Sequence, residues 1–156
     1  MDTNRLHNDI KIELASLRRL ENEMKYLSEM LHNGESFVEI RAAGSIIHDF
    51  YSGIEKVFER IAMLIDGSIP KGESWHVELL SRMAQPFEDK RTEVISEGLF
   101  QILKEYLRFR HLFRNIYGFQ LNWELFRKLC EEMTSTLDLF SEEINTFLEI
   151  MQNKTR

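Results

Sequence analysis

A short stretch late in the chain places charged, titratable and hydrogen-bonding side chains at helical spacing. It reads FRHLFRNIYG, residues 109–118. At about 100° per residue, the polar side chains of this region fall on one arc of an expected helix, and large apolar side chains form the opposite stripe. The polar arc consists of Arg108, Arg110, His111, Arg114, Asn115 and Tyr117.

These residue types suit chemistry on a phosphodiester. Arginine can bind phosphate oxygens through two parallel hydrogen bonds, and histidine exchanges a proton near neutral pH. One group would take the proton of a ribose 2′-hydroxyl, while arginines would stabilise the charge that develops on the phosphate. The spacing therefore permits metal-free cleavage of RNA, although an ordinary solvated helix face has the same general pattern.

Two features favour a binding surface over a merely solvated face. Residues 104–128 contain six basic and two acidic residues, a net charge of +4 in a chain whose total is −6, and no acidic residue occurs between positions 106 and 123. Leu107 and Leu112 also lie in or beside the polar arc, where a partner subunit would cover them. We therefore expect a cationic contact surface on an acidic protein.

The length and composition are those of one globular domain, residues 1–156. The chain has 43% hydrophobic and 29% charged residues, with no apolar run long enough to cross a bilayer and no signal-like N-terminus. We therefore expect a cytoplasmic location and no membrane partner. Cys130 is the only cysteine, which excludes an internal disulfide, and its apolar neighbours predict a buried side chain. The pattern indicates no cofactor and no metal site.

Apolar residues recur at steps of three and four along nearly the whole chain, which predicts an all-α fold. The first helix can end at Gly34, and the second at Asp66 and Gly67, through left-handed caps. Ser74 can cap a short helix over residues 75–84.

The second half of the chain is expected to hold two more helices. A charged linker, EDKRTE, occupies residues 88–93. Helices are then predicted over 96–118 and 122–150. The resulting architecture is an up-and-down helical bundle of four long helices plus one short helix.

The stretch from Arg110 to Tyr117 resembles the motif of the HEPN superfamily, and specifically of the HepT-like ribonuclease toxins. That motif is an arginine, four residues, a histidine, one residue and a tyrosine on a late helix of an all-α bundle. Arg110 and Tyr117 match it, and Asn115 stands where the family has histidine. Residues 49–84 and 103–123 are similar to the same group and, with the intervening helix, cover more than half of the chain.

The resemblance implies a HEPN-like homodimer in which the motif helices of two protomers face each other across a composite cleft. It also implies a metal-independent endoribonuclease that leaves cyclic phosphate ends and is held in check by a co-encoded nucleotidyltransferase antitoxin of the MNT type. By position, Arg110 and Arg114 would bind the scissile phosphate and Arg108 would steer RNA. Asn115 would occupy the proton-transfer position, and Tyr117 would contact the antitoxin or receive AMP from it.

The asparagine at the histidine position changes what such a site can do. An amide is neither a general base nor a general acid, and losing such a group typically costs about 10²- to 10⁴-fold in rate. The asparagine is explained by natural loss of activity, by engineered inactivation, or by transfer of the proton role to His111, one turn away. We expect weak or absent cleavage. The alternative functions are an inactive binding module for a nucleotidyltransferase or its nucleotide, and a purely structural helical adaptor.

Four other residues are assigned structural roles. His76 could join a site, but a histidine that caps the start of the short helix is favoured. Tyr51 and Glu55 lie one helical turn apart, which favours a local pair that orients the helix surface over a lining of the cleft. Trp123 is expected to pack at a helix start rather than to stack on a base.

Overall fold

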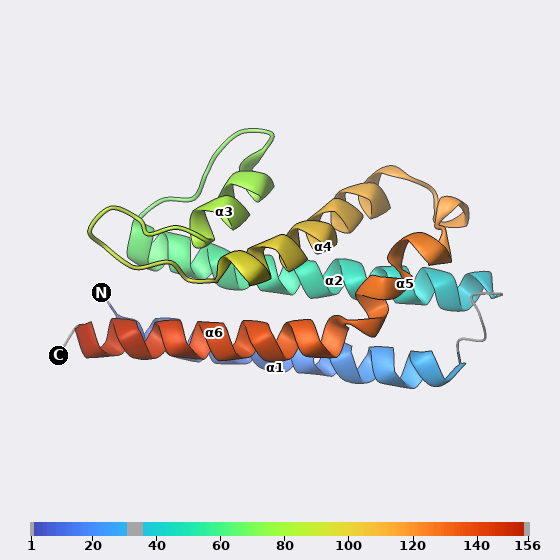
Figure 1. Ribbon diagram of the computed structural model, residues 1–156, viewed down its shortest axis with the longest axis horizontal. Helices are drawn as coiled ribbons and strands as arrows, with labels where there is room; N and C mark the ends of the chain where they lie inside the picture. The colour runs from blue at the N-terminus through green and yellow to red at the C-terminus, as the bar shows by residue number, and fades with distance from the viewer. Residues whose placement is uncertain (1, 31–35, 155–156) are drawn as a thin grey trace.

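The computed structural model describes residues 2–30 and 36–154, and over this part of the chain it confirms the all-α fold. Gly34, which was expected to end the first helix, lies outside the described residues. Six helices follow one another as shown in Figure 1: α1 (Thr3–Met30), α2 (Phe37–Ile61), α3 (Trp75–Met83), α4 (Glu97–Asn115), α5 (Trp123–Glu131) and α6 (Met133–Lys154).

Helices α1, α2, α4 and α6 pack around a shared core, and the start of α1 lies at the same end of the bundle as the end of α6 (Figure 1). Helix α3 lies against α2 and α4, whereas α5 contacts α2, α4 and α6. Phe58 of α2 meets Phe140 of α6 edge to face, with 5.8 Å between ring centroids, and Phe50 of α2 meets Tyr106 of α4 at 5.3 Å. All four rings are fully buried, so α2 is the central helix of the core.

The segment expected to form one last helix consists of two helices, so that prediction is wrong. At Glu132 the backbone leaves the helical conformation (φ −93°, ψ 2°), which separates α5 from α6. Apolar residues at positions 126, 130, 133 and 137 keep helical spacing across this break, and all are buried. Periodicity therefore cannot reveal the break, and the described fold has four long helices with two short ones.

Helix α4 ends at Asn115, three residues before the expected position 118. The next residue is already extended (φ −126°, ψ 162°). The backbone N–H of Tyr117 donates to the side-chain oxygen of Gln120 at 2.8 Å rather than to a helix carbonyl. Tyr117 is therefore not on the helical arc of Arg110, and that part of the predicted polar face is wrong.

The expected helix boundaries on either side of the loop before α3 are confirmed. Helix α2 continues in a short π-helix, Ala62–Asp66, and Gly67 ends it in the left-handed region at φ 86°. Ser74 is the N-cap residue of α3, but its side chain makes no capping hydrogen bond and instead donates to Glu78 Oε1 at 3.4 Å.

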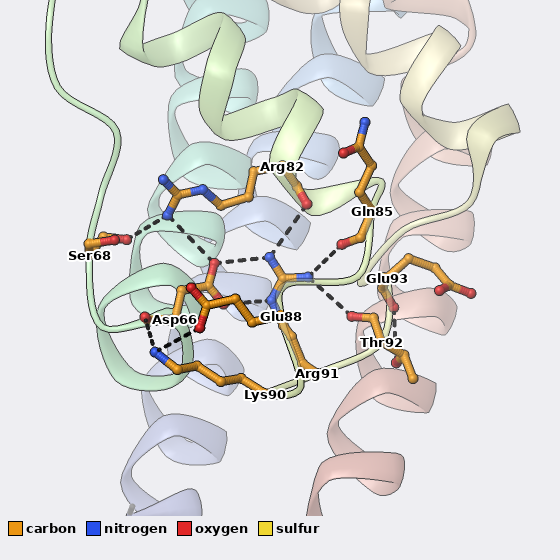
Figure 2. Close-up of polar contacts among 9 residues, drawn as sticks. All are labelled: Asp66, Ser68, Arg82, Gln85, Glu88, Lys90, Arg91, Thr92 and Glu93. Atoms are coloured by element: carbon orange, nitrogen blue, oxygen red, sulfur yellow. Dashed lines mark hydrogen bonds and ion pairs between the residues drawn. The ribbon is translucent and has the colours of Figure 1, made fainter.

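Arg91 of the charged linker forms a buried ion pair with Asp66 at the end of the π-helix after α2, as Figure 2 shows. Arg91 donates through Nε and Nη2 to the two carboxylate oxygens of Asp66, at 2.7 and 2.9 Å. Its Nη1 donates to the carbonyl of Gln85 at 2.8 Å, and neither charged side chain of the pair is exposed. The pair ties the segment after α3 to the end of α2, so it helps to fix where α3 lies.

Candidate functional site

A cavity of about 700 Å³ lies between α3 and α4. Apolar side chains line it together with cationic side chains of α4, so it suits a group that is partly apolar and partly anionic. The lining residues are Glu73, Ser74, His76, Val77, Leu80, Phe100, Lys104, Leu107, Arg108, Arg110 and His111.

The structure divides the predicted site residues into two groups. Arg108, Arg110 and His111 line the cavity from α4. The remaining residues are exposed, lie at or beyond the last turn of α4, and are outside the cavity lining. They are Arg114, Asn115 and Tyr117.

The side chain of Asn115 is bound to its own helix. Its amide Nδ2 donates to the carbonyl oxygen of His111 at 2.6 Å, one turn earlier. Arg108 is exposed and forms an ion pair with Glu105 on the same helix. Neither side chain is therefore fixed in the cavity by a contact with α2 or α3.

Arg110 differs from the other cationic residues of α4 because part of its guanidinium is buried. Its Nε has no hydrogen-bond partner among the described residues, and the same holds for the hydroxyl of the buried Tyr51 on α2. An unsatisfied buried polar group costs about 1–3 kcal/mol. The protein therefore holds this arginine at the cavity without supplying an acceptor to Nε.

His76 lines the cavity from α3 and contacts a buried carboxylate of α2. Nδ1 of His76 lies 2.7 Å from Oε2 of Glu55, and Glu55 is 5% exposed. The indole of Trp75 stacks on the imidazole, with 3.7 Å between ring centroids. His76 therefore ties α3 to α2 instead of capping α3, so the predicted capping role is wrong.

Tyr51 and Glu55 do not form the expected pair on the helix surface, because both are buried. Burial raises the pKa of Tyr51, the charge of Glu55 raises it further, and Arg110 opposes the rise. Burial also raises the pKa of Glu59, again reinforced by Glu55 and opposed by His76. These charges therefore act on one another across α2, α3 and α4.

The sequence contains a signal that Glu55 has a buried partner. Glu55 lies between Ile54 and Val57, within the apolar stripe of α2, and an acidic residue there requires a buried partner. The partner is 21 residues away on another helix, so the spacing of the sequence did not identify it.

Large apolar side chains are exposed around the end of α4. Leu112 is 39% exposed, Tyr117 71%, Phe119 73% and Leu125 71%. Tyr117 and Phe119 stack with 5.3 Å between ring centroids. Leu107, which was expected to be exposed with Leu112, is instead half-buried and lines the cavity.

Two packing predictions are confirmed. Trp123 packs against the core and meets Phe126 edge to face, with 5.3 Å between ring centroids. Cys130 is buried, and burial raises the pKa of its thiol to about 12. This thiol is therefore a small apolar group and not a nucleophile at neutral pH.

The sequence model of the HepT-like protein family matches residues 42–151, which include α3, the cavity and the motif of α4. The chain belongs to the HepT-like protein family. The match confirms the resemblance inferred from Arg110 and Tyr117. No curated protein and no solved structure matches this HepT-like chain. Within the described residues, none of its helices is long and apolar enough to cross a membrane.

Proposed function

We propose that this HepT-like chain is the toxin of a toxin–antitoxin pair, a metal-independent endoribonuclease of the cytoplasm that a co-encoded MNT-type nucleotidyltransferase neutralises. The family match, which includes Arg110 in the cavity, is the observation that carries the proposal. A guanidinium whose buried Nε lacks a partner, in a cavity lined mainly by apolar and cationic side chains with one carboxylate, Glu73, suits a phosphate that carries a sugar and a base.

In this proposal the arginines bind the RNA backbone and the site is weak in proton transfer. Arg110 and Arg114 bind the scissile phosphate, and Arg108 steers the strand. Asn115 occupies the family's histidine position and offers only a hydrogen bond. The expected activity is therefore attenuated, because an amide does not exchange protons near neutral pH.

The complete site is proposed to form in a homodimer in which the α4 helices of two protomers face each other. Arg114 and Asn115 are outside the cavity of their own chain, so a second protomer would bring them to the substrate. The exposed apolar side chains around the end of α4 support such a contact, because soluble proteins rarely leave large apolar groups together in water without a partner.

Arg110→Ala is expected to lower RNA cleavage by about 10²- to 10³-fold, the usual cost of removing one donor that stabilises transition-state charge. The assay uses labelled single-stranded RNA in EDTA at low salt, because phosphate contacts weaken steeply as salt rises. Arg127→Ala is the matched control, since Arg127 pairs with Glu131 at 2.8 Å on α5 and is outside the cavity lining. Its rate should equal that of the native chain.

The same samples test the rest of the proposal. Light scattering should give the mass of a dimer. If neither the native chain nor Asn115→His cleaves RNA, and RNA binding is undetectable at low salt, the ribonuclease proposal fails. The chain would then be an inactive module that binds a nucleotidyltransferase or its nucleotide, an alternative favoured by the absence of a proton-transferring side chain at Asn115.

Tyr117 is expected to carry AMP after co-expression with the neighbouring nucleotidyltransferase. Tyr117 is 71% exposed and lies beyond the end of α4, so an enzyme can reach the phenol. Mass spectrometry of the peptide that contains Tyr117 should show whole AMP units, and Tyr117→Phe should abolish them. An unmodified peptide under these conditions would contradict the modification without affecting the ribonuclease proposal.

A further inference from the structure

The position of His76 is defined by groups on two sides of its ring. Nδ1 lies 2.7 Å from the carboxylate of Glu55, and Trp75 covers one ring face. A carboxylate can only accept a hydrogen bond, so Nδ1 carries the proton that is donated. In the neutral ring Nε2 is then unprotonated and available as a base.

The surroundings of His76 contain what a phosphodiester reaction requires. The side chain of His76 is 24% exposed, whereas that of Glu55 is 7% exposed, so the imidazole can meet a ligand and the carboxylate is shielded behind it. His76 lines the cavity from α3, and Arg110 and His111 line it from α4. Charge-stabilising and proton-transferring groups therefore share one cavity, on opposite walls.

We infer that His76, oriented by Glu55, is the base that accepts the ribose 2′-hydroxyl proton in this chain, in place of the motif histidine that Asn115 has replaced. The inference rests on the proposed ribonuclease function and changes which residue performs its proton transfer. His76 is the catalytic residue of the pair, because it would touch the substrate. Glu55 is a positioning residue, because it would act only through His76.

The reaction is a transesterification within the RNA strand. Nε2 of His76 takes the 2′-hydroxyl proton, the 2′-oxygen forms a bond to phosphorus, and the bond from phosphorus to the 5′-oxygen breaks with its electron pair on that oxygen. The attacking and leaving oxygens lie on opposite sides of phosphorus, so the leaving 5′-oxygen takes its proton from His111 on the other wall. The products are a 2′,3′-cyclic phosphate and a 5′-hydroxyl, and water returns both histidines to their starting protonation states.

The structure also shows why the side chain of Asn115 is not part of the cavity lining. Asn115 is exposed, and its amide is bound to a carbonyl of α4. His76 already faces the cavity and is held there by a contact with a different helix. A base held by a second residue retains its geometry, which catalysis requires because small misplacements cost large factors in rate.

The test distinguishes a proton-transfer role of His76 from a purely structural contact that joins α3 to α2. His76→Asn is the main variant, because its amide nitrogen can replace Nδ1 as donor to Glu55 but cannot act as a base. His76→Ala is assayed with and without added imidazole, and Glu55→Gln tests orientation. The substrate is labelled single-stranded RNA in EDTA, and RNA binding and thermal unfolding are measured for every variant.

We expect His76→Asn and His76→Ala to lower the cleavage rate by about 10²- to 10⁴-fold. His76→Asn should retain the RNA affinity and thermal unfolding of the native chain. Free imidazole should restore part of the activity of His76→Ala but none of that of Arg110→Ala. Glu55→Gln should lower kcat and leave KM unchanged, because the glutamine amide can donate to Nδ1 and favour the wrong tautomer.

Each contrary result would overturn either the role of His76 or the ribonuclease proposal. Cleavage that depends on Arg110 but keeps the native rate in His76→Asn would overturn the inference and leave the proposed function intact. Cleavage by Asn115→His together with an inert native chain would do the same, because the motif position would then supply the proton transfer. If imidazole fails to rescue His76→Ala, the pair is structural. Inert native and Asn115→His proteins would instead end the ribonuclease proposal itself.

Discussion

Replacing Arg91 by methionine is expected to lower the free energy of unfolding by about 3–5 kcal/mol, the usual cost of removing one partner of a buried ion pair. Asp66 would then keep a buried carboxylate without the two hydrogen bonds that it now accepts at 2.7 and 2.9 Å (Figure 2). The carbonyl of Gln85 would lose its donor as well. Urea unfolding followed by circular dichroism measures the change.

Two further variants test whether the unpaired carboxylate of Asp66 causes the loss of stability. Arg82 lies 3.7 Å from Asp66 and donates to the carbonyl of Ser68 at 2.7 Å, so Arg82→Met should cost less than Arg91→Met, which removes both short hydrogen bonds to Asp66. The double replacement of Asp66 by leucine and Arg91 by methionine should recover much of the stability, because an apolar pair has no desolvation penalty. A loss below about 1 kcal/mol in Arg91→Met would show that the pair is hydrated or replaceable.

Phe126→Ala is expected to destabilise the protein by about 3–5 kcal/mol, as is usual when a buried aromatic side chain is removed. Phe126 is 1% exposed and is one of the two buried residues of α5. Its ring stacks on Phe109 of α4 with 4.8 Å between centroids. Removing the ring would leave a cavity between α4 and α5 and loosen the attachment of α5 to the bundle.

Leu125→Ala is the control for this prediction, since Leu125 is the neighbouring residue and is 71% exposed. Measured in protein dilute enough to be monomeric, it should change stability by no more than about 0.5 kcal/mol. Equal losses in the two variants would mean that α5 does not pack as described. A loss in Leu125→Ala that appears only in concentrated protein would instead place Leu125 in the dimer contact.

The parts of the fold that could be predicted from the sequence are those with local signals. Gly67 ends the π-helix after α2, and Ser74 precedes α3, because a left-handed cap and an N-cap each depend on a few adjacent residues. The break at Glu132 has no such signal, because the apolar spacing of the neighbouring helices continues through it.

The same distinction applies to the candidate site. Arg108, Arg110 and His111 share one helix, so helical geometry alone could group them. The contact between Glu55 and His76 joins two helices, and it depends on where α3 lies against α2. That placement depends in turn on Arg91, a residue of the linker whose burial no local pattern indicates. The spacing of residues along the sequence therefore does not predict the contact between Glu55 and His76.

The early end of α4 has a consequence for any enzyme that takes Tyr117 into its own active site. The residue before Tyr117 is extended, and the phenol ring of Tyr117 stacks on the ring of Phe119. Such an enzyme can bind the extended backbone before Tyr117 without melting a turn of α4, and a single 3₁₀ turn, Gly118–Gln120, follows Tyr117. Recognition then requires the stack of Tyr117 on Phe119 to open, together with the hydrogen bonds that join the backbone of Tyr117 to Gln120.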